Sequence, residues 1–284
     1  MTKPVSSSWI TGLGMALLCA AVRVHAEMIL EVHPFKPPTQ LVASFAPLTA
    51  YLSKQLGQPV AVRIAKDYQT HIDAIGKDAV DLAYLGPVAY VKLRETYGPK
   101  PLLARQVIGG SKDFHGKIFV RQDSRLRSLA DLKGKRFAFT EPHSTMGHLV
   151  PRYQLWQAGV PVERLASYQF LGDHVNVALG VLAGDYDAGA VKEDVFYAYA
   201  GRGLRAIATT PPISDHLFVA SRKLSDAQRR TLRAALWQLH QAPEGAQILE
   251  SITPGVTALV PVQDSDYDTL RVVLKKLKEI GVDD

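Results

Sequence analysis

The feature that most constrains the fold is an alternation of strand and helix patterns that occurs twice along the chain. In the first series, short β-rich runs alternate with runs whose apolar residues recur at helical spacing, as in residues 40–56. A second series begins near residue 128, and the segments near 108–120 and 210–221, which connect the two, have an extended pattern. This pattern predicts two α/β units with largely parallel sheets.

The expected elements follow from this periodicity and from the glycines and prolines that end each run. We expect strands at 28–33, 60–65, 80–85, 136–140, 166–171, 187–191 and 204–209, with extended segments at 101–107, 117–120 and 215–221. We expect helices at 40–56, 68–76, 88–97, 147–158, 174–183, 193–200, 225–241 and 265–280. Each unit is too small for a complete doubly wound enzyme, so we expect two lobes with a cleft that closes like a hinge.

The first 26 residues have the pattern of a secretory signal. Lys3 precedes a mostly apolar run from Trp9 to Val22, and Val24-His25-Ala26 fits a small-x-small cleavage site. We therefore expect export to the periplasm with cleavage before Glu27. In the exported chain we expect lobe one to comprise residues 27–112 plus 217–284, and lobe two residues 113–216.

Charge and cysteine content narrow the classes of function. The net charge is +6, or +4 without Lys3 and Arg23, and no dense basic cluster indicates a nucleic-acid partner. A mildly positive protein suits a small anionic ligand. The single cysteine, Cys19, lies inside the predicted signal, which excludes thiolate catalysis and thiolate metal binding from the exported chain.

The stretch TEPHSTMGHLVP, residues 140–151, connects a predicted strand to a predicted helix. Ser144 and Thr145 precede the helix, and Gly147 lets the backbone approach a ligand closely. The first amides of a helix lack partners within the helix and carry the positive end of its dipole. Hydroxyls and free amides together form an oxyanion site. An ordinary capped helix without a ligand remains the alternative.

Polar residues follow the other predicted strands, where ligands of open α/β sheets bind. Tyr84 lies near the end of one strand, and its phenol can donate a hydrogen bond to an oxyanion or pack as part of a wall. His174 follows another strand, where it can donate to an anion or lie exposed beside a capping Asp173. The carboxylates Glu193, Asp194 and Asp215 can accept a proton from the ligand or pair with its amine. Otherwise they are solvated loop acids.

Other chemistries have weaker support. The sequence contains no nucleophile elbow, no phosphate-binding loop of the Gly-x-x-x-x-Gly-Lys type, no dinucleotide fingerprint and no His-Glu-x-x-His motif, so we expect neither an enzyme nor a cofactor. A hydrolase with Ser144 as nucleophile needs a base that an acid orients in space. A zinc site formed by His143, His148, His174 and an acid is a further alternative. It is disfavoured because the positive ends of helix dipoles repel cations.

Taken together, the motifs of this chain are similar to those of the periplasmic phosphate, phosphite and phosphonate-binding proteins of ABC importers. The resemblance covers nearly all of the exported chain. Its marks are FAPLTAYL (45–52), Asp67-Tyr68, VDLAYLGPVAY (80–90), SLADLKGK (128–135), STMGHLVP (144–151), GDH (172–174), GDYDAGAV (184–191) and Asp266-Tyr267. Their order and spacing carry the resemblance, since each is weak alone.

The resemblance implies a two-lobed type II binding-protein fold, with two mixed sheets, a central cleft and two crossover strands. In that family a Ser-Thr-x-Gly turn holds the phosphorus oxygens, a Gly-x-His histidine adds a donor, and tyrosines of lobe one close the site. Carboxylates after the Ala-Val strand and near the second crossing contact the far side of the ligand. The matching residues here are Ser144, Thr145, Met146, Gly147, His174, Tyr68 and Tyr84, with Glu193 or Asp194, and Asp215.

One departure from the family pattern concerns the ligand. The third position of the turn, usually serine, is Met146, which removes a hydroxyl and adds a flexible apolar group. This departure counts against plain phosphate, which needs the full set of donors, and leaves phosphite or an organic phosphonate open. The resemblance implies a monomeric, non-catalytic solute-binding protein that delivers its ligand to an ABC permease. A sensory protein that signals to a membrane histidine kinase is the alternative function.

Overall fold

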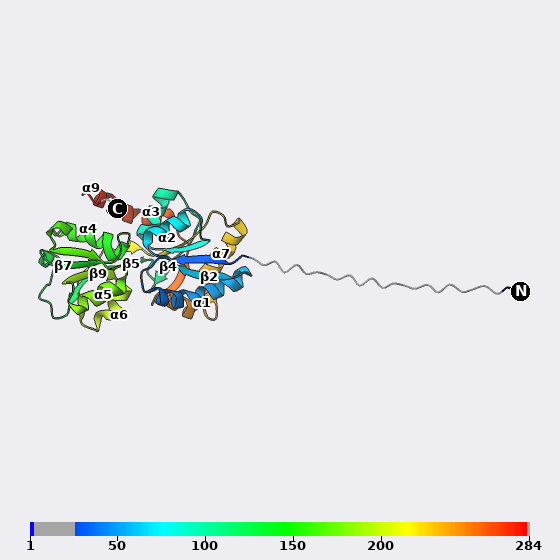
Figure 1. Ribbon diagram of the computed structural model, residues 1–284, viewed down its shortest axis with the longest axis horizontal. Coiled ribbons are helices and arrows are strands. Elements are labelled where there is room, and N and C mark those ends of the chain that lie inside the picture. Colours follow the sequence, from blue (N-terminus) through cyan, green and yellow to red (C-terminus); the bar gives the residue numbers. More distant parts are fainter. Residues whose placement is uncertain (3–25, 283–284) are drawn as a thin grey trace.

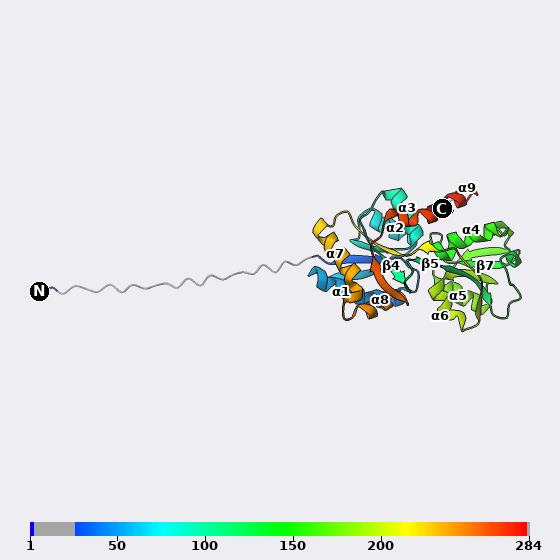
Figure 2. The same ribbon diagram turned by 180° about the vertical axis from the view of Figure 1, so that it is seen from behind.

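The computed structural model describes residues 1, 2 and 26–282 and contains two mixed sheets that lie side by side (Figures 1 and 2). The predicted signal, residues 1–26, falls almost entirely outside the described residues. No helix in the described part of the chain has the length and apolar character needed to cross a membrane.

The six-stranded sheet has the strand order β13-β4-β12-β3-β1-β2. Strands β1, β2 and β3 run parallel, whereas β12 and β13 pair antiparallel with their neighbours. Its strands are β1 (Met28–Val32), β2 (Val60–Ile64), β3 (Leu82–Leu85), β4 (Leu102–Ile108), β12 (Leu217–Ala220) and β13 (Val256–Val260). The helices of this part are α1 (Pro38–Leu56), α2 (Tyr68–Gly76), α3 (Pro87–Tyr97), α7 (Asp226–Gln238), α8 (Gly245–Ile252) and α9 (Asp268–Glu279). We call this part the six-stranded half.

The five-stranded sheet has the order β10-β6-β9-β7-β8, with β7 parallel to both β8 and β9. Its strands are β6 (Gly116–Arg121), β7 (Arg136–Phe139), β8 (Ser167–Phe170), β9 (Ala188–Lys192) and β10 (Leu204–Thr209). The covering helices are α4 (Val150–Gln157), α5 (His174–Ala183) and α6 (Glu193–Ala200). We call this part the five-stranded half. Between the halves, β5 (Asp113–Phe114) pairs antiparallel with β11 (Ile213–Ser214), which confirms the two expected crossings.

Local sequence signals set the helix starts that matter for the site. The Asp67 carboxylate accepts the Thr70 amide at 2.6 Å, and the Asp173 carboxylate accepts the Asn176 amide at 2.8 Å. Each aspartate is therefore an N-cap, the role for which its short carboxylate is favoured. As a result, Tyr68 and His174 are the first residues of α2 and α5, and they follow strands β2 and β8.

The expected elements agree with the structure except in three places. Helix α8 and strand β13 were not expected. The helix expected at 147–158 begins instead with a π-helical turn, Thr145–Leu149, which continues into α4. The strands of the larger sheet lie within 27–112 and 217–284, but the exact lobe boundaries stay a prediction.

An apolar cluster joins the two halves. It contains Val88 of α3, Met146 and Leu149 of the π turn, and Leu270 and Leu277 of α9, all buried. Helix α9 runs from the six-stranded half along α4 of the five-stranded half (Figure 1). We call these contacts the bridging cluster. They show that the halves pack directly against each other in this structure.

A polar network within the six-stranded half is centred on the carboxylate of Asp78. The carboxylate of Asp78 accepts from Lys100 Nζ at 2.6 Å, from Ser221 Oγ at 2.9 Å and from the Arg222 amide at 2.9 Å. Asp78 has a φ of 56°, a left-handed conformation that aspartate tolerates better than most residues. The lysine side chain is fully buried, so this carboxylate compensates a charge that has lost its water.

Candidate functional site

A small enclosed cavity lies where strand ends of the two sheets meet. The cavity is small: the volume open to the centre of a water molecule is only about 10 Å³, which is room for one water. The lining residues follow β1, β2, β3, β7 and β8, lie in β5, end β9, or precede β12. They are His33, Tyr68, Gly86, Phe114, Ser144, Thr145, Met146, His174, Lys192 and His216. The cavity is therefore at the strand ends where ligands of α/β sheets bind.

The Ser-Thr-Met-Gly turn contributes three of these residues, as the sequence predicts. The π turn begins with a bond from the Leu149 amide to the Ser144 carbonyl at 3.0 Å, so the amides of Thr145 and Met146 have no acceptor within it. The Thr145 hydroxyl accepts the Val88 amide at 3.0 Å, which connects the two halves. Its own proton remains able to donate into the cavity.

Gly147 has a different role from the expected one. Its amide donates to Ser144 Oγ at 3.1 Å, and the residue does not line the cavity. A Cβ at this position would lie 2.0 Å from Thr140 Oγ1 and 2.6 Å from Thr140 Cγ2. The glycine is therefore needed for close packing against Thr140. It does not bring the backbone toward the cavity.

His174 presents a donor to the cavity. Its Nδ1 accepts the Lys192 amide at 3.1 Å, so the proton of the neutral ring is on Nε2. Burial, assisted by the nearby Lys192 ammonium, lowers the pKa of His174 to about 3, which keeps the ring neutral. The exposed-histidine alternative is wrong for this residue, because only 3% of it is accessible to solvent.

The two predicted tyrosines differ in position. Tyr68 lines the cavity, and burial raises the pKa of its phenol, which therefore remains a donor. Tyr84 lies behind the lining: its hydroxyl donates to Gln106 Oε1 at 2.7 Å, and its ring stacks on His33 and His216. The structure thus places Tyr84 as a support for the lining histidines.

The three predicted carboxylates line a second pocket of about 280 Å³, which shares Phe114 and Lys192 with the cavity. Asp194 pairs with Lys36 at 3.3 Å and Lys192 at 3.4 Å. Burial alone would raise the pKa of Asp194, but these two ammonium groups outweigh it and lower the pKa to about 2. Glu193 Oε1 accepts the His115 amide at 3.0 Å, so this acid also has a partner.

Asp215, the third carboxylate, is fully buried. Its Oδ1 accepts from Gln106 Nε2 at 2.9 Å and from His216 Nδ1 at 2.8 Å, while its Oδ2 has no hydrogen-bond partner among residues 26–282. The carboxylate therefore fixes the His216 ring from the side away from the cavity. We expected this carboxylate to contact the ligand, but in the structure His216 lies between it and the cavity.

Five lining residues were not among the predicted ones: His33, Gly86, Phe114, Lys192 and His216. His33 directly follows β1 and Lys192 ends β9, so a search of every strand end would have found both. Phe114 lies in the crossing strand β5, and His216 comes just before β12. Neither follows a predicted strand, and the sequence carries no other signal for them.

Comparison with known proteins decides the family. Residues 30–267 match the family of periplasmic substrate-binding proteins of ABC transporters for phosphonate. The chain belongs to this phosphonate-binding family. It is therefore a substrate-binding protein of an ABC transporter and not an enzyme, and the sensory alternative finds no support among its relatives.

Individual relatives of this family member are similar in sequence and in fold. The chain is 29% identical over 272 residues to the phosphate-import protein PhnD of Mycolicibacterium smegmatis, covering 86% of this chain and 84% of that protein. It is 29% identical over 153 residues to a probable ABC transporter phosphite binding protein PhnD1 of Prochlorococcus marinus, covering 51% of each.

Two solved structures confirm the expected two-lobed fold. PhnD1 of Prochlorococcus marinus in complex with methylphosphonate superimposes with a TM-score of 0.82 at 24% identity, covering 89% of this chain and 98% of that one. A binding component of an ABC phosphonate transporter from Pseudomonas aeruginosa gives 0.81 at 22% identity, covering 89% and 86%.

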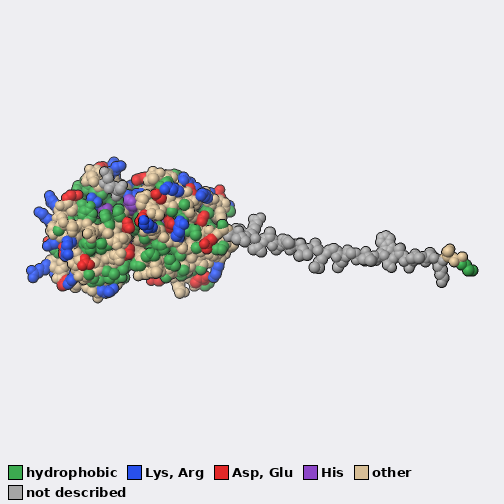
Figure 3. Space-filling model, in the orientation of Figure 1, with side chains coloured by type: hydrophobic (Ala, Val, Ile, Leu, Met, Phe, Trp, Pro, Cys, Tyr) green, Lys and Arg blue, Asp and Glu red, His purple; other side chains and the backbone are tan. Residues whose placement is uncertain are grey.

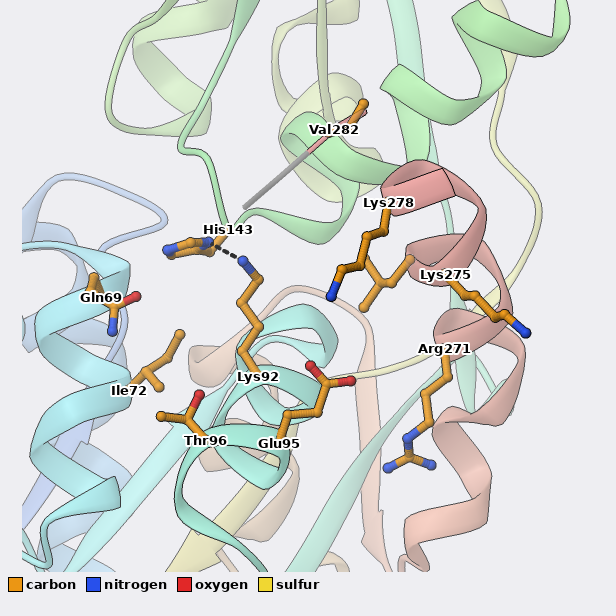
Figure 4. Close-up of a pocket in the computed structure, with 11 residues that line it drawn as sticks. Gln69, Ile72, Lys92, Glu95, Thr96, His143, Arg271, Lys275, Lys278 and Val282 are labelled. Atoms are coloured by element: carbon orange, nitrogen blue, oxygen red, sulfur yellow. Dashed lines mark hydrogen bonds between the residues drawn. The ribbon is translucent and has the colours of Figure 1, made fainter. Parts of the chain in front are cut away.

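A much larger pocket of about 670 Å³ lies elsewhere on this phosphonate-binding family member, between α2, α3 and α9 (Figure 4). Arg271, Lys275 and Lys278 extend from α9, and Lys92 of α3 bonds to His143 at 2.8 Å. Histidine and basic side chains are visible where the halves meet beside α9 (Figure 3). No residue of this pocket lines the cavity, so we do not assign the ligand to it.

The three histidines considered for zinc lie apart. His143 contacts Lys92 in the larger pocket, whereas His148 bonds to the Pro142 carbonyl at 2.7 Å and packs against Phe139 and Phe170. His174 alone lines the cavity. Within residues 26–282, no group of three or more His, Cys, Asp or Glu side chains is placed to hold a metal ion.

Proposed function

We propose that this protein captures a small phosphorus oxyanion in the cavity between its halves and presents it to the membrane permease of its transporter. The observation that carries the proposal is the set of donors that meet there: the hydroxyls of Ser144, Thr145 and Tyr68, Nε2–H of His174, and Lys192. Buried donors of this kind need an acceptor, which an oxyanion supplies.

Capture requires that the halves separate. We propose that residues 27–112 plus 217–284 and residues 113–216 move as two lobes about the β5–β11 ribbon. On closure, the Thr145 hydroxyl meets the Val88 amide, and the His174 amide meets the Phe35 carbonyl at 3.3 Å. We propose that the protein acts as a periplasmic monomer, exported through a cleaved signal at residues 1–26, without a nucleic-acid partner.

Lys192 favours a ligand without an amine. Its buried ammonium lines both pockets and lies 3.4 Å from Asp194 Oδ1 and 4.4 Å from the Phe35 ring centroid. Burial lowers the pKa of Lys192, whereas Asp194 and Asp215 oppose this effect. Lys192 thus places a positive charge between the proposed oxyanion site and the carboxylates of the second pocket. An ammonium group on the ligand would be repelled by this like charge. Phosphite, methylphosphonate and phosphate fit this class.

A Lys192→Met variant tests this selectivity. We expect the wild-type protein to bind methylphosphonate at least about tenfold more tightly than 2-aminoethylphosphonate, a difference of about 1.4 kcal/mol. The variant, which keeps the chain length but removes the charge, should lower that ratio by about tenfold or more. Calorimetric titration with both ligands measures the ratio of their dissociation constants. An unchanged ratio would show that Lys192 does not set selectivity.

A His174→Asn variant tests the site itself. Asn places an acceptor near the position of Nδ1, where it can still take the Lys192 amide, but it removes the Nε2 donor. Loss of one hydrogen bond to a charged ligand costs about 1.5–3 kcal/mol, so we expect affinity to fall by about 10- to 100-fold. Calorimetry against phosphite, methylphosphonate, phosphate and sulfate provides the measurement.

The control for this variant is His148→Asn, which changes a buried histidine outside the cavity. It should retain wild-type affinity once its folding is verified by circular dichroism. If the His174 variant binds every oxyanion as tightly as the wild-type protein does, the ligand lies elsewhere.

A further inference from the structure

Two histidines of the cavity, His33 and His216, form a stacked pair whose Nδ1 atoms are both engaged. Their ring centroids lie 5.2 Å apart with an interplanar angle of 18°. His33 Nδ1 lies 3.0 Å from the Tyr84 carbonyl, which can only accept, so Nδ1 carries a proton. His216 Nδ1 lies 2.8 Å from Asp215 Oδ1, and the same reasoning assigns a proton to it.

The Nε2 atoms of the two rings converge on one side of the cavity. A methyl group added to Gly86 would lie 3.6 Å from Nε2 of His216 and 3.8 Å from Nε2 of His33. Neither atom makes a hydrogen bond within the described part of the chain. Gly86 lines the cavity together with both rings, so these nitrogens lie at the cavity wall.

Both rings are neutral, because burial lowers the pKa of each, and Lys192 acts in the same direction. Asp215 opposes the effect at His216 without reversing it. A neutral ring with a proton on Nδ1 has an unprotonated Nε2, which accepts hydrogen bonds. The charged and titratable groups that face the pair are His71, Tyr68, Tyr84, His174, Lys192, Asp194 and Asp215.

The cavity therefore combines several donors with two acceptors, and a fully ionised oxyanion would leave the acceptors facing negative oxygens. We propose that the bound ligand shares one proton with Nε2 of His33 or His216, so that the site selects the singly protonated oxyanion. This inference rests on the proposed function and adds the protonation state of its ligand. Sulfate, which carries no proton near neutral pH, should be rejected because it leaves both acceptors unpaired.

The proposal predicts how affinity depends on pH. Below the second pKa of the ligand, the free ligand already carries the shared proton, and affinity should be constant. Above that pKa, the free ligand is a dianion and one proton must be taken up on binding. The dissociation constant should then rise about tenfold per pH unit.

Calorimetry of phosphite and methylphosphonate between about pH 5.5 and pH 8.5, in two buffers of different ionisation enthalpy, tests this prediction. We expect an uptake of about one proton per ligand at the alkaline end and none at the acidic end. The midpoint of the affinity change should follow the second pKa of each ligand. One common midpoint for both ligands would assign the titration to the protein and overturn the proposal.

Substitutions locate the proton. The double variant His33→Asn/His216→Asn keeps a donor near each Nδ1 and removes both Nε2 acceptors, so proton uptake and the slope with pH should disappear. The control His148→Asn makes the same type of substitution outside the cavity, and it should keep both the proton uptake and the slope of affinity with pH. If the wild-type protein binds oxyanions with neither proton uptake nor dependence on pH, this inference is wrong and the proposed function stands. If it binds no oxyanion at any pH, the proposed function fails.

Discussion

Replacement of Gly147 by alanine should destabilise the protein by about 3 kcal/mol, the upper range for overpacking of a buried site. The added methyl would lie 2.0 Å from Thr140 Oγ1, 2.6 Å from Thr140 Cγ2 and 2.7 Å from Ser144 Oγ. Rotation of Thr140 about χ1 can replace only one of its two facing branches with hydrogen, so the other branch and Ser144 Oγ still meet the new methyl. Urea unfolding followed by circular dichroism measures the loss.

Two further variants make this prediction specific. Gly201→Ala adds a methyl where no atom lies within 4 Å and where φ is −65°, so its stability should match that of the wild-type protein. Thr140→Ala combined with Gly147→Ala removes both branches that the new methyl meets and should recover part of the lost stability. A Gly147→Ala protein within about 0.5 kcal/mol of the wild-type protein would contradict this explanation.

An Asp78→Ala variant should lose about 3–5 kcal/mol of stability at neutral pH, the cost of leaving one partner of a buried ion pair uncompensated. Lys100 would keep a fully buried ammonium without its carboxylate, and the Arg222 amide and Ser221 hydroxyl would lose their acceptor. Chemical denaturation at pH 7 measures the change. A loss below about 1 kcal/mol would show that water replaces the carboxylate.

The same network predicts a pH dependence. Burial alone would raise the pKa of Asp78, but the bonds from Lys100, the Arg222 amide and Ser221 lower it to about 2. The folded state therefore holds the ionised form more strongly than the unfolded chain does. Its contribution to stability is present above the unfolded pKa, near 4, and is lost as pH falls toward 2. An Asp78→Asn variant, which also tolerates left-handed φ, should show less of this acid dependence.

Much of the fold could be predicted because local signals and tertiary packing agree. Helices α2, α5 and α6 have the expected boundaries, since Asp67 and Asp173 cap two of them and apolar periodicity defines all three. Strand β13 was missed because Val256–Val260 forms a sheet edge with a register shift and has no clear alternation of burial. Helix α8 was missed because its 8 residues are too short for a clear helical repeat. The π turn depends on Thr140 and Gly147 packing together, which no local pattern reports.

The site could be predicted in part, because strand ends are visible in a sequence whereas side-chain directions are not. Ser144, Thr145, Met146 and His174 follow strands and reach the cavity. Tyr84 also lies at a strand end, yet its hydroxyl turns to Gln106 in the sheet interior.

The histidine pair is a harder case, since His33 and His216 are 183 residues apart in sequence and become neighbours only through the pairing of β12 with β3 and of β3 with β1. Each of them, taken alone, is an ordinary histidine next to an apolar strand. Their joint role depends on sheet order, which sequence patterns leave open.

The bridging cluster has a calorimetric consequence. Its side chains are buried between the halves, so a closing movement would remove them from water, and burial of apolar surface lowers the heat capacity. If closure accompanies capture, the enthalpy of binding should become steadily more favourable as temperature rises, even though the ligand itself is a polar ion. Binding of a polar ion would then show the negative heat-capacity change that is typical of apolar burial, because the protein and not the ligand supplies the apolar surface.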